Sequence, residues 1–282
     1  MNVKLRIQSI SHHMTWFLGT RFPKTFPLVF VVGYPKSGTT WACQLVADYL
    51  QLPFPQFSLL PIGCHAIIHG HERVWKNCPK GVYIIRDGRD ALVSQYFFRS
   101  RSIPEGDHPQ MTAYQRRSFP GLVNKANVKD NITSFLKRQL ANPRFAKANW
   151  GQHARSYFEV ANTNVVLLRY EDLLTDGPNT LAQAMSKLTS QPVDLERAQR
   201  SIDRFSFKKQ AGRSAGQEDR SAFLRKGQTG DWRNHFTKDA AKIFDKHCGD
   251  MLIQAGYESD HSWVDTFCSE ISKKTTSVGS VT

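Results

Sequence analysis

The most constraining feature of this sequence is an apolar run that leads directly into a loop of glycine, lysine and hydroxyl residues. The run occupies residues 28–32, within a predicted strand over 26–32, and the loop follows at 33–40. A strand without polar positions is typical of a sheet that is covered on both faces. After the loop, apolar residues at helical spacing predict a helix over 40–51.

The same order of strand, loop and helix recurs along the chain. A strand over 81–85 precedes a helix over 89–99, and a strand over 165–169 precedes a helix near 180–189. Repetition of this unit predicts an α/β fold with a central parallel sheet flanked by helices and a phosphate-binding loop after the first strand. We expect a single domain over residues 1–268, with 1–25 as an N-terminal extension. The Ser, Thr and Lys-rich residues 269–282 are expected to be disordered.

The loop after the first strand has the chemistry of a phosphate cradle. Gly33 and Gly38 allow close approach of the backbone, Lys36 supplies a cation, and the hydroxyl donors are Ser37, Thr39 and Thr40. The helix that follows directs its N–H groups and the positive end of its dipole at the same place. In nucleoside triphosphatases the lysine directly follows the last glycine of the loop, whereas here it lies two residues before Gly38.

Three stretches in the same order resemble the sulfotransferase family that uses 3'-phosphoadenosine-5'-phosphosulfate (PAPS). The sequence Tyr34-Pro35-Lys36-Ser37-Gly38-Thr39-Thr40-Trp41 resembles the loop that binds the 5'-phosphosulfate. Residues 82–90, followed by Ser94, resemble the strand and helix that bind the 3'-phosphate, and residues 225–236 resemble the third signature. The resemblance implies a P-loop-like fold, PAPS as the sulfuryl donor, 3',5'-adenosine diphosphate (PAP) as the product, and no metal.

The resemblance also implies which residues bind the cofactor. These are Lys36, Ser37, Gly38, Thr39, Thr40, Trp41, Arg86, Ser94, Tyr170, Ser206, Phe207, Arg225, Lys226 and Gly227. Trp41 would stack on the adenine and Tyr170 would reach its edge. From the residues alone, Arg86 ends a strand and Ser94 lies about two turns into the next helix, so both can reach one phosphate. An ion pair between Arg86 and Asp90 is the structural alternative.

Catalysis by this family needs a base for the acceptor hydroxyl and a cation for the leaving phosphate oxygen. By the resemblance, Lys36 is the cation and His71 is the base, with His69 where the cytosolic branch has lysine. Glu72 is a rival base, because glycan-acting branches are expected to use a carboxylate.

Charge and cysteine content limit the partners and the compartment. The net charge of +14 favours anionic ligands, but no aromatic signature of an RNA-binding module accompanies it, so no nucleic-acid partner is expected. Five widely spaced cysteines and the absence of a secretory signal indicate a cytoplasmic protein. Zinc binding around Cys64 and Cys78 is disfavoured, because the ligand spacing is wrong. The basic N-terminus is compatible with an anionic membrane, although packing against the domain is favoured.

The rival functions and the acceptor depend on weaker signals. A P-loop kinase or NTPase needs an Asp that closes an apolar strand, and the strand over 82–85 is followed by Arg86 instead. A non-catalytic polyanion-binding module is supported by charge alone. The basic connection over 102–129 favours a saccharide or glycolipid hydroxyl over a small alcohol or phenol as the acceptor. The sequence does not indicate the oligomeric state.

Overall fold

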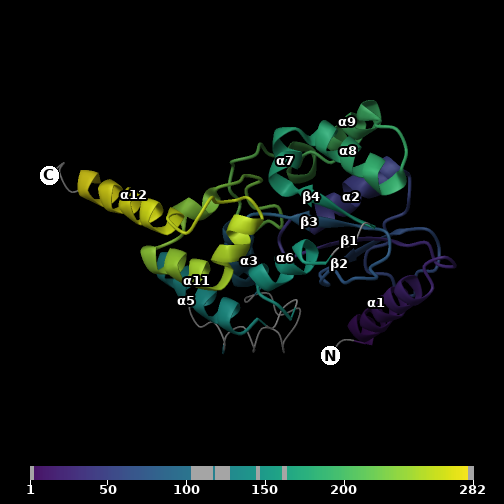
Figure 1. Ribbon diagram of the computed structural model, residues 1–282, viewed down its shortest axis with the longest axis horizontal. Coiled ribbons are helices and arrows are strands. Elements are labelled where there is room, and N and C mark those ends of the chain that lie inside the picture. Colours follow the sequence, from purple (N-terminus) through teal and green to yellow (C-terminus); the bar gives the residue numbers. More distant parts are fainter. Residues whose placement is uncertain (1–2, 103–116, 118–127, 144–146, 161–163, 279–282) are drawn as a thin grey trace. The chain divides into compact units, whose positions relative to one another are not determined.

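The computed structural model describes residues 3–102, 117, 128–143, 147–160 and 164–278 (Figure 1). The chain divides into two compact units. Unit 1 comprises Met1–Arg86 and Ser156–Glu218, and unit 2 comprises Asp87–Arg155 and Asp219–Thr282. Most of the connection over 102–129, from which the acceptor was inferred, lies outside the described residues.

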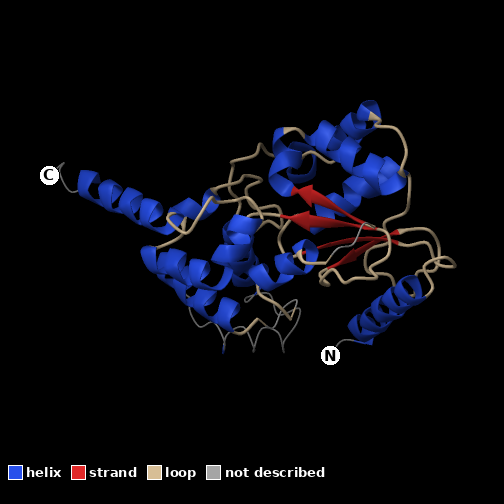
Figure 2. Cartoon of the chain, in the orientation of Figure 1, coloured by secondary structure: helices blue, strands red, loops and turns tan. Residues whose placement is uncertain are grey.

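Unit 1 contains a four-stranded parallel sheet, drawn in red in Figure 2. Its strands are β1 (Val29–Gly33), β2 (Ile67–Gly70), β3 (Gly81–Ile85) and β4 (Val165–Arg169), in the order β2-β1-β3-β4. β1 begins at Val29, whose N–H donates the first bond across the sheet to Ala66, whereas Pro27 has no N–H to donate. β3 and β4 have the predicted bounds, and β2 was not predicted, because four residues that include His69 give no strand pattern.

Helices cover both faces of this sheet. On one face, α2 (Thr39–Leu50), α8 (Gly177–Thr189) and α9 (Leu195–Arg204) pack against one another and share a core with Val31 and Ile84. The short helix α7 (Tyr170–Thr175) precedes α8, and the short helix α10 (Phe207–Ala211) follows α9. On the other face, Trp16 of α1 (Val3–Arg21) packs on Phe30, with ring centroids 4.5 Å apart. The expected α/β fold, with a parallel sheet flanked by helices, is therefore confirmed.

Unit 2 is helical. It contains α3 (Gly88–Ser102), α5 (Val128–Ala141), most of α6 (Trp150–Phe158), the 3-10 helix η2 (Asp231–Asn234), α11 (Lys238–Gln254) and α12 (Trp263–Val278). Arg89 is at its centre: the guanidinium binds Asp87 at 2.7 Å and Glu258 at 2.5 Å, and it lies 4.0 Å from the Trp232 ring centroid. α12 continues over residues 269–278, for which the sequence predicts disorder.

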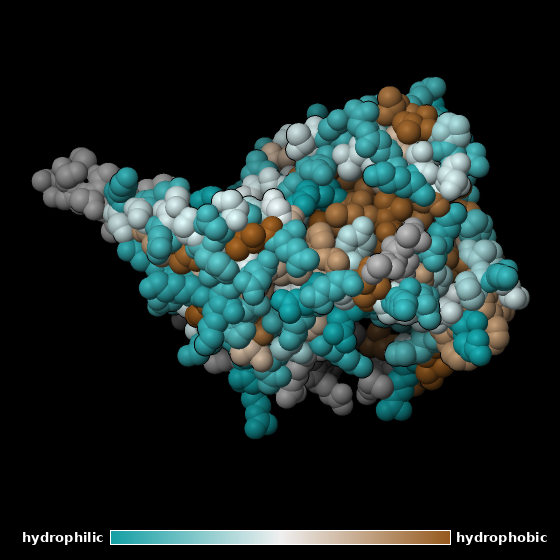
Figure 3. Space-filling view, viewed as in Figure 1, coloured by the Kyte–Doolittle hydropathy of each residue, from teal (hydrophilic) through white to brown (hydrophobic). Residues whose placement is uncertain are grey.

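The surface of the described residues is mixed in polarity. Hydrophilic residues cover most of the face in Figure 3, and apolar residues gather over the strands of unit 1. Among the described residues, none of the helices combines the length and the apolar character that crossing a bilayer requires.

Candidate functional site

The loop between β1 and α2 has two residues in the left-handed backbone region. Lys36 has a φ of 72°, and Gly38, the N-cap of α2, has a φ of 89°. The left-handed conformation costs a non-glycine residue about 1–2 kcal/mol, so its presence at Lys36 indicates a functional constraint. Backbone of this kind directs successive N–H groups at an anion, and the dipole of α2 acts in the same direction.

Gly33 and Gly38 are required by close packing around the loop. A Cβ atom at Gly33 would lie 2.6 Å from the carbonyl oxygen of Ile84 in the neighbouring strand. At Gly38 a Cβ atom would lie 2.7 Å from the ring of Tyr170. The loop is therefore held against β3 on one side and against the start of α7 on the other.

Two hydroxyl groups of the loop have no protein partner among the described residues. Ser37 is 0% exposed and Thr39 is 3% exposed, and neither side-chain oxygen makes a hydrogen bond there. A buried hydroxyl without a partner costs about 1–3 kcal/mol. Both would be satisfied by the acceptor oxygens of a phosphate or sulfate group, so the residues present fit such a group. The third loop hydroxyl, that of half-buried Thr40, follows in the first turn of α2.

Arg86 lies at the carboxyl end of β3, beside the loop. Its Nη1 donates to the Lys36 carbonyl oxygen at 3.3 Å, and its guanidinium lies 4.5 Å from the centroid of the Tyr170 ring. Trp41 packs edge-on against the same ring, at a centroid distance of 5.6 Å. Unit 1 thus brings the loop, Arg86, Trp41 and Tyr170 together at the carboxyl ends of the strands.

The residues that are predicted to contact the adenine are held in place by the chain after α9. The indole Nε1 of Trp41 donates to the carbonyl oxygen of Phe205 at 2.9 Å, which fixes the orientation of its ring. Ser206 is the N-cap of α10 and Phe207 is the first residue of that helix. The guanidinium of Arg213 lies 5.4 Å from the Phe207 ring centroid.

His71 lies immediately after β2 and is tied to the loop. Because β2 pairs with β1 in parallel register, the chain after Gly70 reaches the end of β1, and the Nδ1 of His71 donates to the Gly33 carbonyl oxygen at 2.8 Å. A carbonyl oxygen only accepts, so Nδ1 carries the proton and Nε2 is the acceptor nitrogen of the neutral ring. Burial lowers the pKa of His71 below 6.5, and the nearby charge of Lys36 lowers it further. His71 is therefore neutral at pH 7.

Glu72 and His69 lie beside His71 and have different properties. Burial alone would raise the pKa of Glu72, but the hydrogen bond from His12 of α1, at 3.4 Å, contributes to a pKa below the usual value. Burial, with help from His71, lowers the pKa of His69 to about 4. The rings of His69 and His71 are 4.7 Å apart, edge to face. Glu72 is thus a carboxylate of low basicity at neutral pH.

The remaining predicted residues lie in unit 2. Ser94 is half-buried in the second turn of α3. Arg225 and Lys226 each bind the Asp231 carboxylate at 2.5 Å, and Gly227 follows with a φ of 66°. The two cations that were expected to clamp an anion are therefore held by an internal carboxylate.

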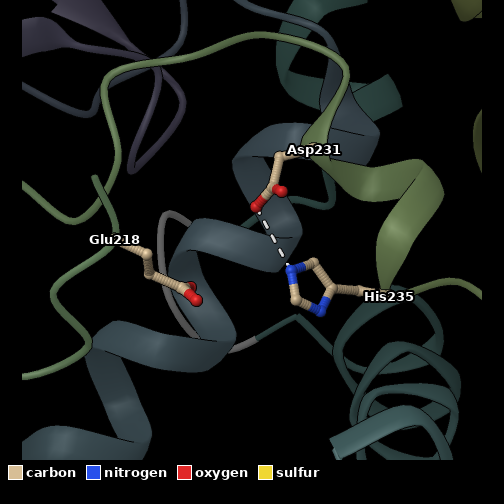
Figure 4. A group of neighbouring side chains, drawn as sticks. All are labelled: Glu218, Asp231 and His235. Carbon is tan, nitrogen blue, oxygen red and sulfur yellow. Dashed lines mark hydrogen bonds and ion pairs between the residues drawn. The ribbon is translucent and has the colours of Figure 1, made fainter. Parts of the chain in front are cut away.

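Figure 4 shows Asp231 beside His235, whose Nε2 lies 3.2 Å from an Asp231 oxygen; Glu218, also drawn, belongs to unit 1. Burial would raise the pKa of Asp231, but hydrogen bonds from His235, Lys226 and Arg225 lower it well below its usual range. Both carboxylate oxygens have these donors, and the two cations would repel a metal ion. Asp231 and His235 are therefore better explained as a structural ion pair than as a metal site.

Sequence reasoning missed three residues of these networks. His12 lies 60 residues before its partner Glu72, and no local pattern indicates the contact. Asp90, considered above as a partner of Arg86, accepts hydrogen bonds from the backbone N–H groups of Gly230 and Trp232. Asp231 was visible only as part of the third signature.

The comparisons with known sequences agree on one family. A family model described as the sulfotransferase domain matches residues 50–256, more than half of the 282-residue chain. Amine sulfotransferase of Oryctolagus cuniculus is 24% identical over an alignment of 257 residues, and the match covers 77% of this chain and 78% of the relative. The 3-alpha-hydroxysteroid sulfotransferase of Cavia porcellus is 27% identical over an alignment of 304 residues, and the match covers 88% of this chain and 96% of the relative.

Solved structures show the same fold at lower identity. The crystal structure of mouse sulfotransferase SULT7A1 complexed with PAP has a TM-score of 0.55 and 23% identity, and the match covers 80% of this chain and 84% of that one. Retinol dehydratase in complex with androsterone and inactive cofactor PAP has a TM-score of 0.58 and 19% identity, and the match covers 86% of this chain and 85% of that one. Because the sequence match covers most of a chain with this parallel sheet and loop, the protein belongs to the sulfotransferase family.

Proposed function

We propose that the protein transfers the sulfuryl group of PAPS to an acceptor hydroxyl and releases PAP and a proton. The observation that carries this proposal is the loop after β1, with the buried hydroxyls of Ser37 and Thr39 and the left-handed backbone at Lys36. PAPS supplies an activated sulfuryl group on its 5'-phosphate. The PAP in the two solved relatives named above supports the same donor.

Each part of PAPS has a matching group in the chain. Lys36, Ser37, Gly38, Thr39 and Thr40 would hold the 5'-phosphate. In unit 1, Arg86 would bind the 3'-phosphate, and the adenine would contact Trp41, Tyr170, Ser206 and Phe207. For Ser94, Arg225, Lys226 and Gly227 of unit 2, cofactor binding is proposed from the sequence resemblance alone. The fixed indole of Trp41 supports this assignment, because a stacking ring that is already oriented loses little freedom on binding.

The tautomer of His71 supports its role as the base. The Nε2 atom takes the proton of the acceptor hydroxyl as the new oxygen–sulfur bond forms and the bond from sulfur to the 5'-phosphate oxygen breaks. The Lys36 ammonium stabilises the negative charge that develops on the leaving oxygen. Glu72 is disfavoured as the base, because its lowered pKa makes it a weak proton acceptor.

The acceptor is proposed from the sequence alone. The basic connection over 102–129 favours a saccharide or glycolipid hydroxyl, whereas the relatives named above are named for an amine and a hydroxysteroid. The cytoplasmic location likewise stays a prediction that depends on the cysteines.

Transfer of labelled sulfate from PAPS, in the presence of a metal chelator, tests the activity. The acceptor panel contains phenols, steroids, amines, glycolipids and oligosaccharides. We expect product with at least one hydroxyl acceptor and a loss of turnover in Lys36→Ala. A preference for a simple phenol over every saccharide would contradict the acceptor proposal only. Magnesium-dependent phosphate transfer from ATP, with no transfer from PAPS, would contradict the function itself and favour the kinase alternative.

A further inference from the structure

Helix α1 packs on the rest of unit 1 through Trp16, whose ring contacts Phe30, and through a row of small and polar residues. Ser11, Thr15 and Gly19, four residues apart, are the buried positions of the helix. At Gly19 a Cβ atom would lie 2.6 Å from the Leu28 side chain, so the helix backbone is in close contact with the segment that leads into β1. The hydroxyl of Thr15 accepts the N–H of Ile62 at 2.8 Å, which fixes the helix further.

The opposite side of the helix is an exposed apolar stripe. Its residues follow at intervals of four and three, which places them on one helical face. We call them the α1 stripe: Val3, Ile7, Ile10, Met14 and Phe17, of which Val3 is 71%, Ile10 60% and Phe17 59% exposed. An ordinary surface helix turns its apolar face toward the core, whereas α1 leaves this apolar face exposed.

A neighbouring loop adds further exposed apolar residues. Phe57 is 78% exposed and Leu60 is 74% exposed. The loop is attached to α1, because the side-chain amide of Gln8 donates to the Phe57 carbonyl oxygen at 3.1 Å. Contiguous exposed apolar groups of this kind mark a surface that contacts a partner or a membrane.

The charge around the stripe identifies the partner. No Asp or Glu occurs in residues 1–47, while Arg6, Arg21 and Lys24 are exposed at or near the helix. Arg21 is the next position in the spacing of the stripe. Apolar residues flanked by basic ones match the interface of an anionic bilayer. A second copy of the chain would bring the same positive charges together, which opposes self-association.

We propose that α1 docks on an anionic lipid bilayer. The helix lies in the plane of the interface, with the α1 stripe among the acyl chains near the headgroups and Arg6, Arg21 and Lys24 against the lipid phosphates and carboxylates. The side of the helix that carries Trp16 and Thr15 remains packed on the rest of unit 1.

Flotation of the full chain with phosphatidylcholine vesicles, with or without phosphatidylserine, tests this proposal. We expect binding to the anionic vesicles that weakens as added salt shortens the screening length. Ile10→Asp should reduce the bound fraction about tenfold or more, because an apolar contact is lost and a repulsive charge is added. Arg6→Glu should reduce it at least about fivefold. The matched control is Leu195→Asp, at a 48% exposed apolar residue of α9, and it should bind like the wild type.

Three outcomes would overturn the proposal. The first is an absence of binding to anionic vesicles, and the second is an equal loss of binding in Ile10→Asp and Leu195→Asp. The third is a dimer in sedimentation velocity without lipid that Ile10→Asp converts to a monomer, which would assign the stripe to a second copy. Circular dichroism and melting of each variant show whether it is folded, and Arg6→Glu, at an exposed position, keeps the test valid if Ile10→Asp does not fold.

Discussion

At the scale of single residues, one hydrogen bond decides which imidazole nitrogen of His71 can act as a base. The Gly33 carbonyl oxygen accepts a hydrogen bond from Nδ1–H, so Nε2 is the accepting nitrogen. The same carbonyl belongs to the first residue of the loop that carries Lys36. The position of the proposed base is therefore tied directly to the position of the proposed phosphate site.

His71→Ala should reduce kcat by about 10²–10⁴-fold, because proton transfer from the acceptor is lost. The affinity for PAP should remain close to that of the wild type, since His71 acts on the acceptor. Steady-state kinetics and isothermal titration with PAP measure the two quantities. Glu72→Gln is the matched control and should retain most of the activity. If Glu72→Gln is inactive while His71→Ala is active, the carboxylate is the base.

At the scale of elements, the segment between Arg225 and Asn234 is held by two carboxylates. Asp90 of α3 binds the N–H groups of Gly230 and Trp232, at 2.6 and 2.9 Å. Asp231 binds the side chains of Arg225 and Lys226. The cations are therefore oriented in advance, and an anion that binds to them has to compete with Asp231.

Asp231→Asn should lower the free energy of unfolding by about 3 kcal/mol, because two partly buried cations lose their charged partner. Urea unfolding of the full chain measures the loss. Asp239→Asn, at an exposed position in the first turn of α11, is the control and should change stability by less than about 1 kcal/mol. An equal effect of the two substitutions would show that the Asp231 network contributes little.

At the scale of the whole molecule, the buried imidazoles make stability depend on pH. The pKa of His69 is about 4 in the folded protein, mainly because of burial, against about 6.5 in an unfolded chain. Between these values the unfolded state binds more protons than the folded one. Stability from this group is therefore fully present above pH 6.5 and is lost as the pH falls toward 4.

We expect the free energy of unfolding to decrease from pH 7 to pH 5, with His69 contributing no more than about 3 kcal/mol over its whole range. His69→Gln should flatten this dependence without abolishing it, because burial lowers the pKa of His71 as well. Urea titrations at the two pH values measure the slope. His13→Gln, at an exposed residue of α1, is the control. If the free energy of unfolding of His69→Gln depends on pH as steeply as that of the wild type, buried His69 does not cause the dependence.

The sequence predicts features that depend on neighbours in the chain and misses those that depend on distant ones. The strands at Gly81–Ile85 and Val165–Arg169 were predicted, because each is a short and mainly apolar run of neighbouring residues. The loop hydroxyls and Arg86 could be recognised for the same reason. β2 was missed, and so was the contact between His12 and Glu72, because each depends on residues brought together by folding over long separations.

The discontinuity of unit 1 has a consequence for its synthesis on the ribosome. β3 is complete at Ile85, but β4, which pairs with its open edge, begins only at Val165, after the whole segment Asp87–Arg155 of the other unit has been made. At about 5–20 residues per second, that segment of about 70 residues delays the pairing by about 4–14 s. During this interval the nascent chain presents an unpaired apolar strand, which is the kind of edge that chaperones cover and that neighbouring nascent chains can join.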